Sequence, residues 1–323
     1  MASAPVAVDP HLDLFAEIER LKRERRALVL AHFYQEPDIQ DVADALGDSL
    51  ELSKRARDAR DVDVIAFCGV HFMAETAKIL APDKIVVVPD LEAGCSLAES
   101  VDPRALAAWR AAHPEHVVVS YINCTAETKA LSDWICTSSN AERVIRAIPE
   151  GKPILFVPDR HLGAWLVKQT GRPMDLWPGT CIVHETFSAR KLVAMKERHP
   201  DAEVIAHPEC DASVLAHADF VGSTAKLLRR VIDAPARRFI VATEKGILHE
   251  MRKRAPGKEL LEAPFDAELG RGACSACNEC PHMKRNTLEK LHLALRDLAP
   301  RIEMDEELRR RARVPLDRML ALG

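Results

Sequence analysis

Short runs of apolar residues alternate along the chain with longer segments of helical periodicity. Three of these runs lead directly into a polar side chain, namely His32, Tyr121 and His207. After each one comes an apolar-periodic segment, and then a Ser/Thr-bearing turn that opens another helix. Short apolar strands that alternate with helices predict small parallel sheets with helices on both faces.

The spacing inside these segments repeats. The intervals from His32 to Ser49, from Tyr121 to Ser138 and from His207 to Thr224 are each 17 positions long. Every unit then continues with a second strand-like run, a helix and a third strand-like run that reaches a loop with Gly and Cys. Self-similarity of this kind indicates repeated structural units.

We therefore predict an α/β fold of three pseudo-repeated three-layer αβα domains, each with a small parallel sheet, arranged around a pseudo-threefold axis. The expected domains are residues 1–110 with an N-terminal helix, residues 111–195, and residues 196–323 with the C-terminal helices. Ligands of such sheets bind beyond the carboxyl ends of the strands. Three sets of strand ends would thus face one central cavity.

Composition and charge narrow the possible functions. The chain has 49 acidic and 45 basic residues, a net charge of −4, and no long basic stripe, so we expect no nucleic-acid partner. It shows neither a secretory signal nor a run of about 18 apolar residues, so we expect a cytoplasmic protein without a membrane partner. Nine cysteines, an odd number, favour metal ligation or catalysis over a disulfide framework in that compartment.

A CxxCxxC loop at residues 274–280 is the strongest metal signal. It could be a ferredoxin-type run that lacks its fourth cysteine, or half of a zinc site. Alternatively, one of its thiols joins Cys95 and Cys181, from the equivalent loops of the other units, on a single [4Fe–4S] cluster. The repeat favours this last interpretation but does not choose among the loop thiols. Three protein ligands would leave one iron open as a Lewis acid.

Polar residues at the strand ends and turns supply candidate chemistry. His32, His207, Glu209 and Tyr121 are candidate acid–base groups, and Asn123 could orient a substrate. Ser49, Ser138 and Thr224 lie at helix starts, where they could cap the helices or bind an anion such as a carboxylate or phosphate. His71, His161 and His184 are further candidates near the same strand ends and loops.

Several ordered motifs resemble those of the quinolinate synthase family, from about residue 20 to 295. They are AHFYQ at 31–35, GDSL at 47–50, AGCSL at 93–97, YIN at 121–123, TSSN at 137–140, WPGTC at 177–181, HPEC at 207–210, GST at 222–224 and CPHMK at 280–284. The resemblance implies a transferase of NAD biosynthesis that condenses iminosuccinate with dihydroxyacetone phosphate to give quinolinate, phosphate and water. We also expect a functional link to the enzyme that supplies iminosuccinate. The protein itself is expected to be a monomer or a homodimer.

The resemblance also implies a site. The cluster ligands would be Cys95, Cys181 and Cys280, with Cys274 and Cys277 as an optional redox pair. The catalytic residues would be Glu209, His207, Tyr121, His32 and Tyr34. The substrate-binding positions would be His32, Ser49, Tyr121, Ile122, Asn123, Ser138, His207, Pro208, Glu209 and Thr224.

Two other functions fit the residues alone. An aconitase-type hydro-lyase would use an open iron on a single hydroxy acid, without a phosphorylated co-substrate. A non-catalytic electron carrier would have a closed cluster that is indifferent to dicarboxylates.

Overall fold

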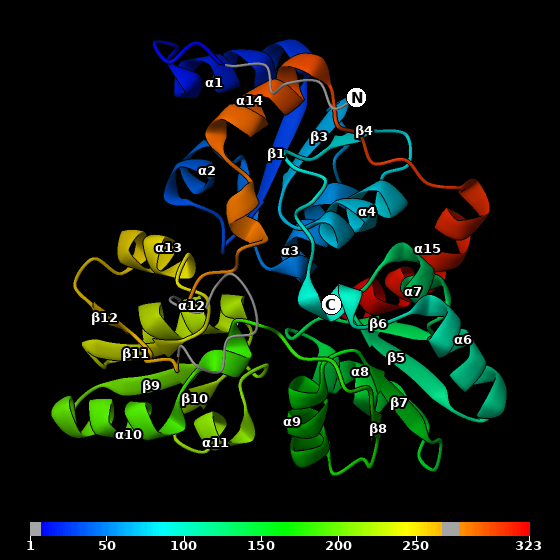
Figure 1. The fold of residues 1–323 in the computed structure, drawn as a ribbon, viewed down its shortest axis with the longest axis vertical. Coiled ribbons are helices and arrows are strands. Elements are labelled where there is room, and N and C mark those ends of the chain that lie inside the picture. Colours follow the sequence, from blue (N-terminus) through cyan, green and yellow to red (C-terminus); the bar gives the residue numbers. More distant parts are fainter. Residues whose placement is uncertain (1–7, 267–277) are drawn as a thin grey trace.

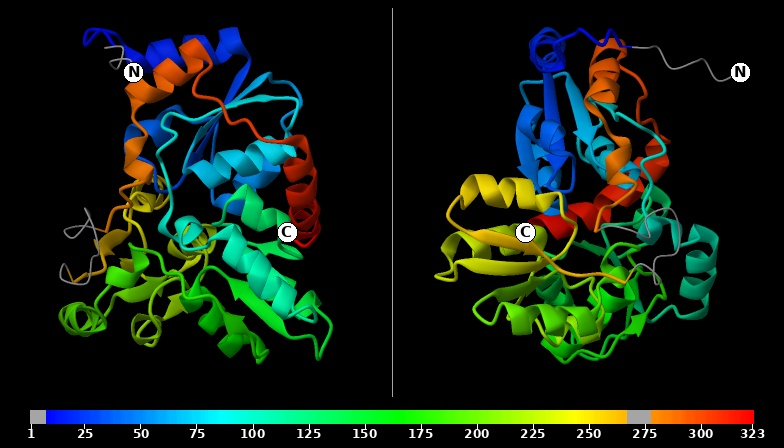
Figure 2. Two further views of the ribbon diagram at one scale, coloured as in Figure 1. Left: turned by 45° about the vertical axis from the view of Figure 1, so that its right-hand side comes forward. Right: turned by 60° about the vertical axis from the view of Figure 1, so that its left-hand side comes forward.

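The computed structural model describes residues 8–266 and 278–323, so Cys274 and Cys277 lie outside the described residues. Within these ranges it contains three four-stranded parallel sheets flanked by helices (Figure 1). The three sheets follow one another along the chain and occupy separate regions of the molecule (Figure 2). The predicted class, three pseudo-repeated αβα units, is confirmed.

All three sheets have the same strand order. The first contains β1 (Ala27–His32), β2 (Ala45–Gly47), β3 (Val64–Cys68) and β4 (Ile85–Val87), in the order β2-β1-β3-β4. The second contains β5 (Val117–Tyr121), β6 (Trp134–Cys136), β7 (Ile154–Val157) and β8 (Asp175–Leu176), in the order β6-β5-β7-β8. The third contains β9 (Glu203–Ala206), β10 (Phe220–Val221), β11 (Arg238–Ala242) and β12 (Glu259–Glu262), in the order β10-β9-β11-β12.

The strand register repeats as well as the strand order. The paired residues are Leu30 with Ala45, Val119 with Trp134, and Ile205 with Phe220, so the partner lies 15 positions later in each sheet. Strands β2, β6 and β10 were missed by the sequence interpretation, which predicts a helical segment followed by a turn there. They have two or three residues each, too few to show an apolar pattern.

The helices follow the same repeat. In chain order they are α1 (Leu14–Arg25), α2 (Pro37–Val42), α3 (Ser49–Arg57), α4 (His71–Leu80), α5 (Ser96–Glu99), α6 (Pro103–Ala112), α7 (Ala126–Ala130), α8 (Ala141–Ala147), α9 (Arg160–Thr170), the 3₁₀ helix η1 (His184–Thr186), α10 (Ala189–Arg198), α11 (Ala212–Leu215), α12 (Thr224–Asp233), α13 (Ile247–Arg254), the 3₁₀ helix η2 (Met283–Arg285), α14 (Leu288–Asp297) and α15 (Glu306–Ala321). Many start at a side chain that accepts a backbone N–H, as Asp48 does for α3 and Ser223 for α12.

The two C-terminal helices pack against the first and second units. Helix α14 lies beside α1, and the buried side chains of Leu291 and Leu295 share a core with Ile18 and Leu21. Helix α15 packs against α4 of the first unit and α7 of the second (Figure 1). The domain limits at 110 and 195 stay a prediction.

The cores of the three units consist mainly of the central strands and the inner helix faces. Strand β3 is buried along its whole length, and so is β7. Both faces of a parallel sheet are covered by helices, which is why these strands are continuous apolar runs without polar alternation. Among the described residues, no helix combines the length and apolar character needed to cross a lipid bilayer.

Candidate active site

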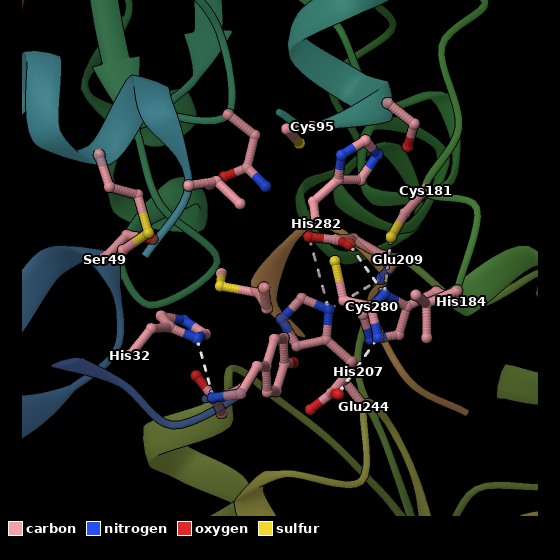
Figure 3. Close-up of a pocket in the computed structure, with 18 of the residues that line it drawn as sticks. His32, Ser49, Cys95, Cys181, His184, His207, Glu209, Glu244, Cys280 and His282 are labelled. Carbon is pink, nitrogen blue, oxygen red and sulfur yellow. Dashed lines mark hydrogen bonds and ion pairs between the residues drawn. The ribbon is translucent and has the colours of Figure 1, made fainter. Parts of the chain in front are cut away.

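The carboxyl ends of the three sheets surround one central cavity, with an empty volume of about 720 Å³ including space open to solvent. Thirteen of the residues singled out from the sequence line it: His32, Tyr34, Ser49, Cys95, Tyr121, Asn123, Ser138, Cys181, His184, His207, Glu209, Thr224 and Cys280. Figure 3 labels several of them. Ile122 and Pro208 are buried beside them and do not line the cavity. The repeat therefore brings matching residues from all three units to one place.

The three cavity cysteines come from equivalent loops. Cys95 precedes α5, Cys181 follows β8, and Cys280 precedes η2 (Figure 3). Burial raises the pKa of the Cys95 thiol to about 12 and that of Cys280 to about 11. Burial also raises the pKa of Cys181, and the other two thiols add to this rise because they are nearby.

Backbone N–H groups partly offset the cost of ionising these thiols. Leu97 and Ala98 donate toward Cys95, the backbone of His184 toward Cys181, and His282 and Met283 toward Cys280. Thiolates that accept backbone N–H groups in a partly buried site are the ligands that iron–sulfur clusters use. The three thiols therefore fit a cluster with three protein ligands. Cys181 also lies with His184 and Glu209 in a set whose ligand atoms are within 4.8 Å of one another, so these residues could bind a metal ion.

The histidines of the first and third units are held in the same way. The backbone N–H of Tyr34 donates to His32 Nδ1 at 3.2 Å, and that of Glu209 donates to His207 Nδ1 at 3.4 Å. Burial lowers the pKa of both imidazoles to about 3, so both are neutral at physiological pH. Because Nδ1 accepts, Nε2 carries the proton, and it donates from His207 to Ser138 Oγ at 3.3 Å.

Glu209 is the centre of a buried hydrogen-bond network. The Tyr121 hydroxyl donates to Glu209 Oε1 at 2.6 Å, and His184 Nδ1 lies 2.9 Å from Oε2 (Figure 3). Burial opposes ionisation of the carboxyl, but the neighbouring imidazoles and the Tyr121 hydroxyl outweigh it, so the pKa of Glu209 lies below its usual range. Glu209 is therefore a carboxylate with two donors already in place.

The network continues beyond His184 to Tyr34. Thr243 Oγ1 is 2.9 Å from His184 Nε2 and 2.6 Å from the Tyr34 hydroxyl. Since His184 Nδ1 donates to a carboxylate, Nε2 must accept from Thr243, which in turn accepts from Tyr34. Burial raises the pKa of Tyr34 and Tyr121 well above the usual value, so both hydroxyls keep their protons. One chain of hydrogen bonds thus joins the two tyrosines through Glu209.

The Ser/Thr residues face the cavity without capping the helices. The caps of α3 and α12 are Asp48 and Ser223, while Ser49 and Thr224 are the first residues of these helices and line the cavity. Asn123 Oδ1 is buried in the wall and has no hydrogen-bond partner among the described residues. A buried acceptor of this kind is costly unless a ligand satisfies it, which favours a substrate with a donor at this point.

Sequence reasoning missed several residues of the wall. Glu244 follows β11 and lines the cavity, and the strand-end rule used for the first strand of each unit identifies it when it is applied to the second. Two other histidine candidates lie outside this wall: His71 is 41% exposed, and His161 lies 3.7 Å from Asp211 by a separate surface pocket. In the part of the chain that the structure describes, no Lys or Arg lines the central cavity.

The fold and the site together define a class: a three-unit α/β enzyme with one cysteine from each unit on a shared polar active-site cavity. Comparison with known proteins narrows this class. The family model of the quinolinate synthetase A protein matches residues 16–321. The quinolinate synthase of Nostoc punctiforme is 58% identical over 312 residues, which cover 97% of this chain and 94% of that protein. That of Chloroherpeton thalassium is 55% identical over 327 residues and all of both chains. The chain belongs to the quinolinate synthase family.

Proposed function

We propose that this enzyme is a cytoplasmic transferase of NAD biosynthesis that condenses iminosuccinate with dihydroxyacetone phosphate to give quinolinate, phosphate and water. The observation that carries the proposal is the convergence of one thiol from each unit on a cavity that also contains Glu209 and the three turn hydroxyls. The name of the family and the resemblance of the site motifs support the same reaction.

Cys95, Cys181 and Cys280 would hold the cofactor, a [4Fe–4S] cluster. When bound, a cluster with three protein ligands supplies a Lewis-acidic iron that assists loss of water from an oxygen-bearing substrate. The nearby thiols and their backbone donors support this assignment, because an ionised thiolate in a buried site needs such donors. The fourth corner of such a cluster would have no cysteine from the described residues of the cavity wall.

Neutral donors would recognise the anionic groups of the substrates. The neutral His32 imidazole has an Nε2–H group, the Nε2–H of His207 orients the Ser138 hydroxyl, and Ser49, Ser138 and Thr224 contribute hydroxyls. The N-terminus of α3 and that of α12 add partial positive charge at the same wall. These groups would hold phosphate early in the reaction and carboxylates later. Asn123 would bind a substrate donor through its unsatisfied Oδ1.

Glu209 would move protons during enolisation and ring closure. Its carboxylate is buried, ionised and oriented by Tyr121 and His184, so it is in the form that accepts a proton, although the same two donors lower its basicity. Tyr121 and His32 would be its proton-transfer partners. Tyr34 would be connected to Glu209 through the hydrogen bonds of Thr243 and His184. Because iminosuccinate is unstable, the enzyme that produces it would be a functional partner.

The test is an assay of the anaerobically prepared enzyme with freshly generated iminosuccinate and dihydroxyacetone phosphate, with quinolinate detected by mass spectrometry. Cys95→Ser, Cys181→Ser and Cys280→Ser should each remove both the visible absorbance of the cluster and the activity. Cys210→Ser is a matched control, because its thiol donates to the Ala242 carbonyl at 3.4 Å and a hydroxyl can do the same. Turnover of a hydroxy acid alone, or activity without iron after chelation, would contradict the proposal.

A further inference from the structure

The Ser/Thr turns of the three units are tied to one another by side chains. Ser139, in the turn before α8, lies with its Oγ 2.5 Å from Asp48 Oδ2 and 2.7 Å from Ser223 Oγ. Asp48 belongs to the first unit, Ser139 to the second and Ser223 to the third. Asp48 and Ser223 are buried, with 6% and 0% of their surface exposed. We call these three side chains the turn triad.

The hydroxyl of Ser139 links the other two members of the turn triad. A carboxylate only accepts, so Ser139 is the donor toward Asp48, and its hydroxyl also faces Ser223 Oγ as a donor. Ser223 Oγ in turn accepts the backbone N–H of Lys226 at 3.4 Å. At the other end, Asp48 Oδ1 accepts the N–H groups of Leu50 and Glu51, both at 3.0 Å. The chain therefore runs without a break from the start of α12 to the start of α3.

Every member of the turn triad is next to a cavity hydroxyl in the sequence. Asp48 precedes Ser49, Ser139 follows Ser138, and Ser223 precedes Thr224. These three neighbours line the cavity, one from each unit. Fixing the turn triad therefore fixes the distances between three hydroxyls that otherwise belong to separate sheets.

We propose that Ser139 is a positioning residue that aligns Ser49, Ser138 and Thr224 for an anionic ligand by coupling the three turns. The identity of the anionic ligand rests on the proposed function, whereas the coupling of the three turns is inferred from the hydrogen bonds alone. Loss of a hydrogen bond to a charged group changes an equilibrium by about tenfold or more, so loss of the Ser139 hydroxyl should be measurable at a distance.

Ser139→Ala isolates this role because it breaks both hydrogen bonds of the turn triad and removes no helix cap. The cap of α3 is Asp48 and that of α12 is Ser223, whereas the N-cap of α8 is Asn140. Ser132→Ala is the matched control. Its hydroxyl also has two partners, Ser120 Oγ and the Thr128 carbonyl, both at 2.7 Å, but all three lie in the second unit.

The first test is hydrogen exchange by mass spectrometry on the full-length enzyme, which needs no ligand. Ser139→Ala should speed exchange roughly tenfold in the peptides that cover 47–52 and 222–227, although neither contains the substitution. Ser132→Ala should leave both peptides unchanged. If Ser139→Ala leaves them unchanged as well, the turns are not coupled and the proposal is wrong.

The second test is calorimetric titration of quinolinate into the anaerobically prepared enzyme. Ser139→Ala should weaken binding about tenfold, and Ser139→Thr, which keeps the hydroxyl, should restore it. In a double-mutant cycle with Thr224→Val, the Ser139→Ala penalty should shrink, because the group that it positions is gone. Unchanged binding, full additivity, or a Thr variant as weak as the Ala variant would each overturn the positioning role.

The two tests separate this proposal from the proposed function. If wild-type enzyme fails to bind quinolinate, the proposed function is contradicted, while hydrogen exchange still decides whether the turns are coupled. If quinolinate binds and Ser139→Ala has no effect in either test, only the positioning role fails.

Discussion

Replacing Tyr121 by Phe removes one hydroxyl from a buried part of the cavity wall. That hydroxyl donates to Glu209 Oε1 at 2.6 Å, and Tyr121 and Glu209 are 5% and 3% exposed. Phe keeps the ring and its packing, so the substitution tests the hydrogen bond alone. Glu209 retains its second donor, His184 Nδ1, at 2.9 Å.

The size of the effect follows from the charge of the acceptor. A hydrogen bond to a charged group contributes about 1.5–3 kcal/mol, which corresponds to a change of roughly 10- to 150-fold in an equilibrium or rate. If Glu209 carries protons in the reaction, Tyr121→Phe should lower kcat/KM by a factor in this range. The iron content and the cluster absorbance should stay at the wild-type level, because Tyr121 is not a proposed ligand.

The assay is steady-state quinolinate formation under anaerobic conditions, for the wild type, Tyr121→Phe, Glu209→Gln and the double variant. Since Tyr121 acts through Glu209, the double variant should be no less active than Glu209→Gln alone. Losses that multiply in the double variant would show that Tyr121 acts independently of Glu209. Near-normal turnover of Glu209→Gln with an intact cluster would refute the assignment of Glu209 as the proton carrier.

Two further predictions concern the interface between the first and second units. Burial raises the pKa of Glu75, although the Lys129 and His71 charges oppose the rise. The folded state therefore binds the proton more tightly, and the unfolding free energy should fall as the pH rises from the ordinary value of 4.5 through the raised pKa. Glu75→Gln should flatten this dependence in urea unfolding curves, and equal slopes for both proteins would contradict the assignment. Lys129 is fully buried, with its Nζ donating to the Cys124 carbonyl and lying 5.2 Å from the Phe72 ring centroid. Lys129→Met should lower the unfolding free energy by about 3 kcal/mol, because it leaves the Cys124 carbonyl without its donor and Glu75 without a nearby cation. A loss below about 1 kcal/mol in the same urea unfolding measurement would show that the buried cation is dispensable.

Much of the architecture could be predicted because the three units show the same local pattern of apolar runs, turns and spacings in the sequence. The 17-residue interval reflects a fixed strand register and a fixed turn, so Ser49, Ser138 and Thr224 were found from spacing alone. Strand β7 was predicted with its observed ends, because a fully buried strand is an uninterrupted apolar run. The two-residue strand β10 could not be found in this way.

The rest depended on contacts between distant parts of the chain. Repeat equivalence alone did not select Cys280 among three loop thiols; the resemblance did, and the structure brings this residue to the cavity wall. His184 was one candidate among several histidines, and only its distances to Glu209 and Thr243 distinguish it from His71. Helix α15 packs against α4 and α7, and this tertiary contact could not be predicted from the apolar periodicity of the helix.

We expect the described wall of the cavity, which has no Lys or Arg, to hold anions by oriented dipoles and not by cationic side chains. Dissolved ions screen long-range attraction between charges but scarcely alter a short donor contact in a partly buried site. Raising the ionic strength should therefore cost this enzyme little affinity. We then expect selectivity to depend on the positions of the ligand's oxygen atoms, because the described wall offers no flexible guanidinium that could adjust to an anion of the right charge but the wrong shape.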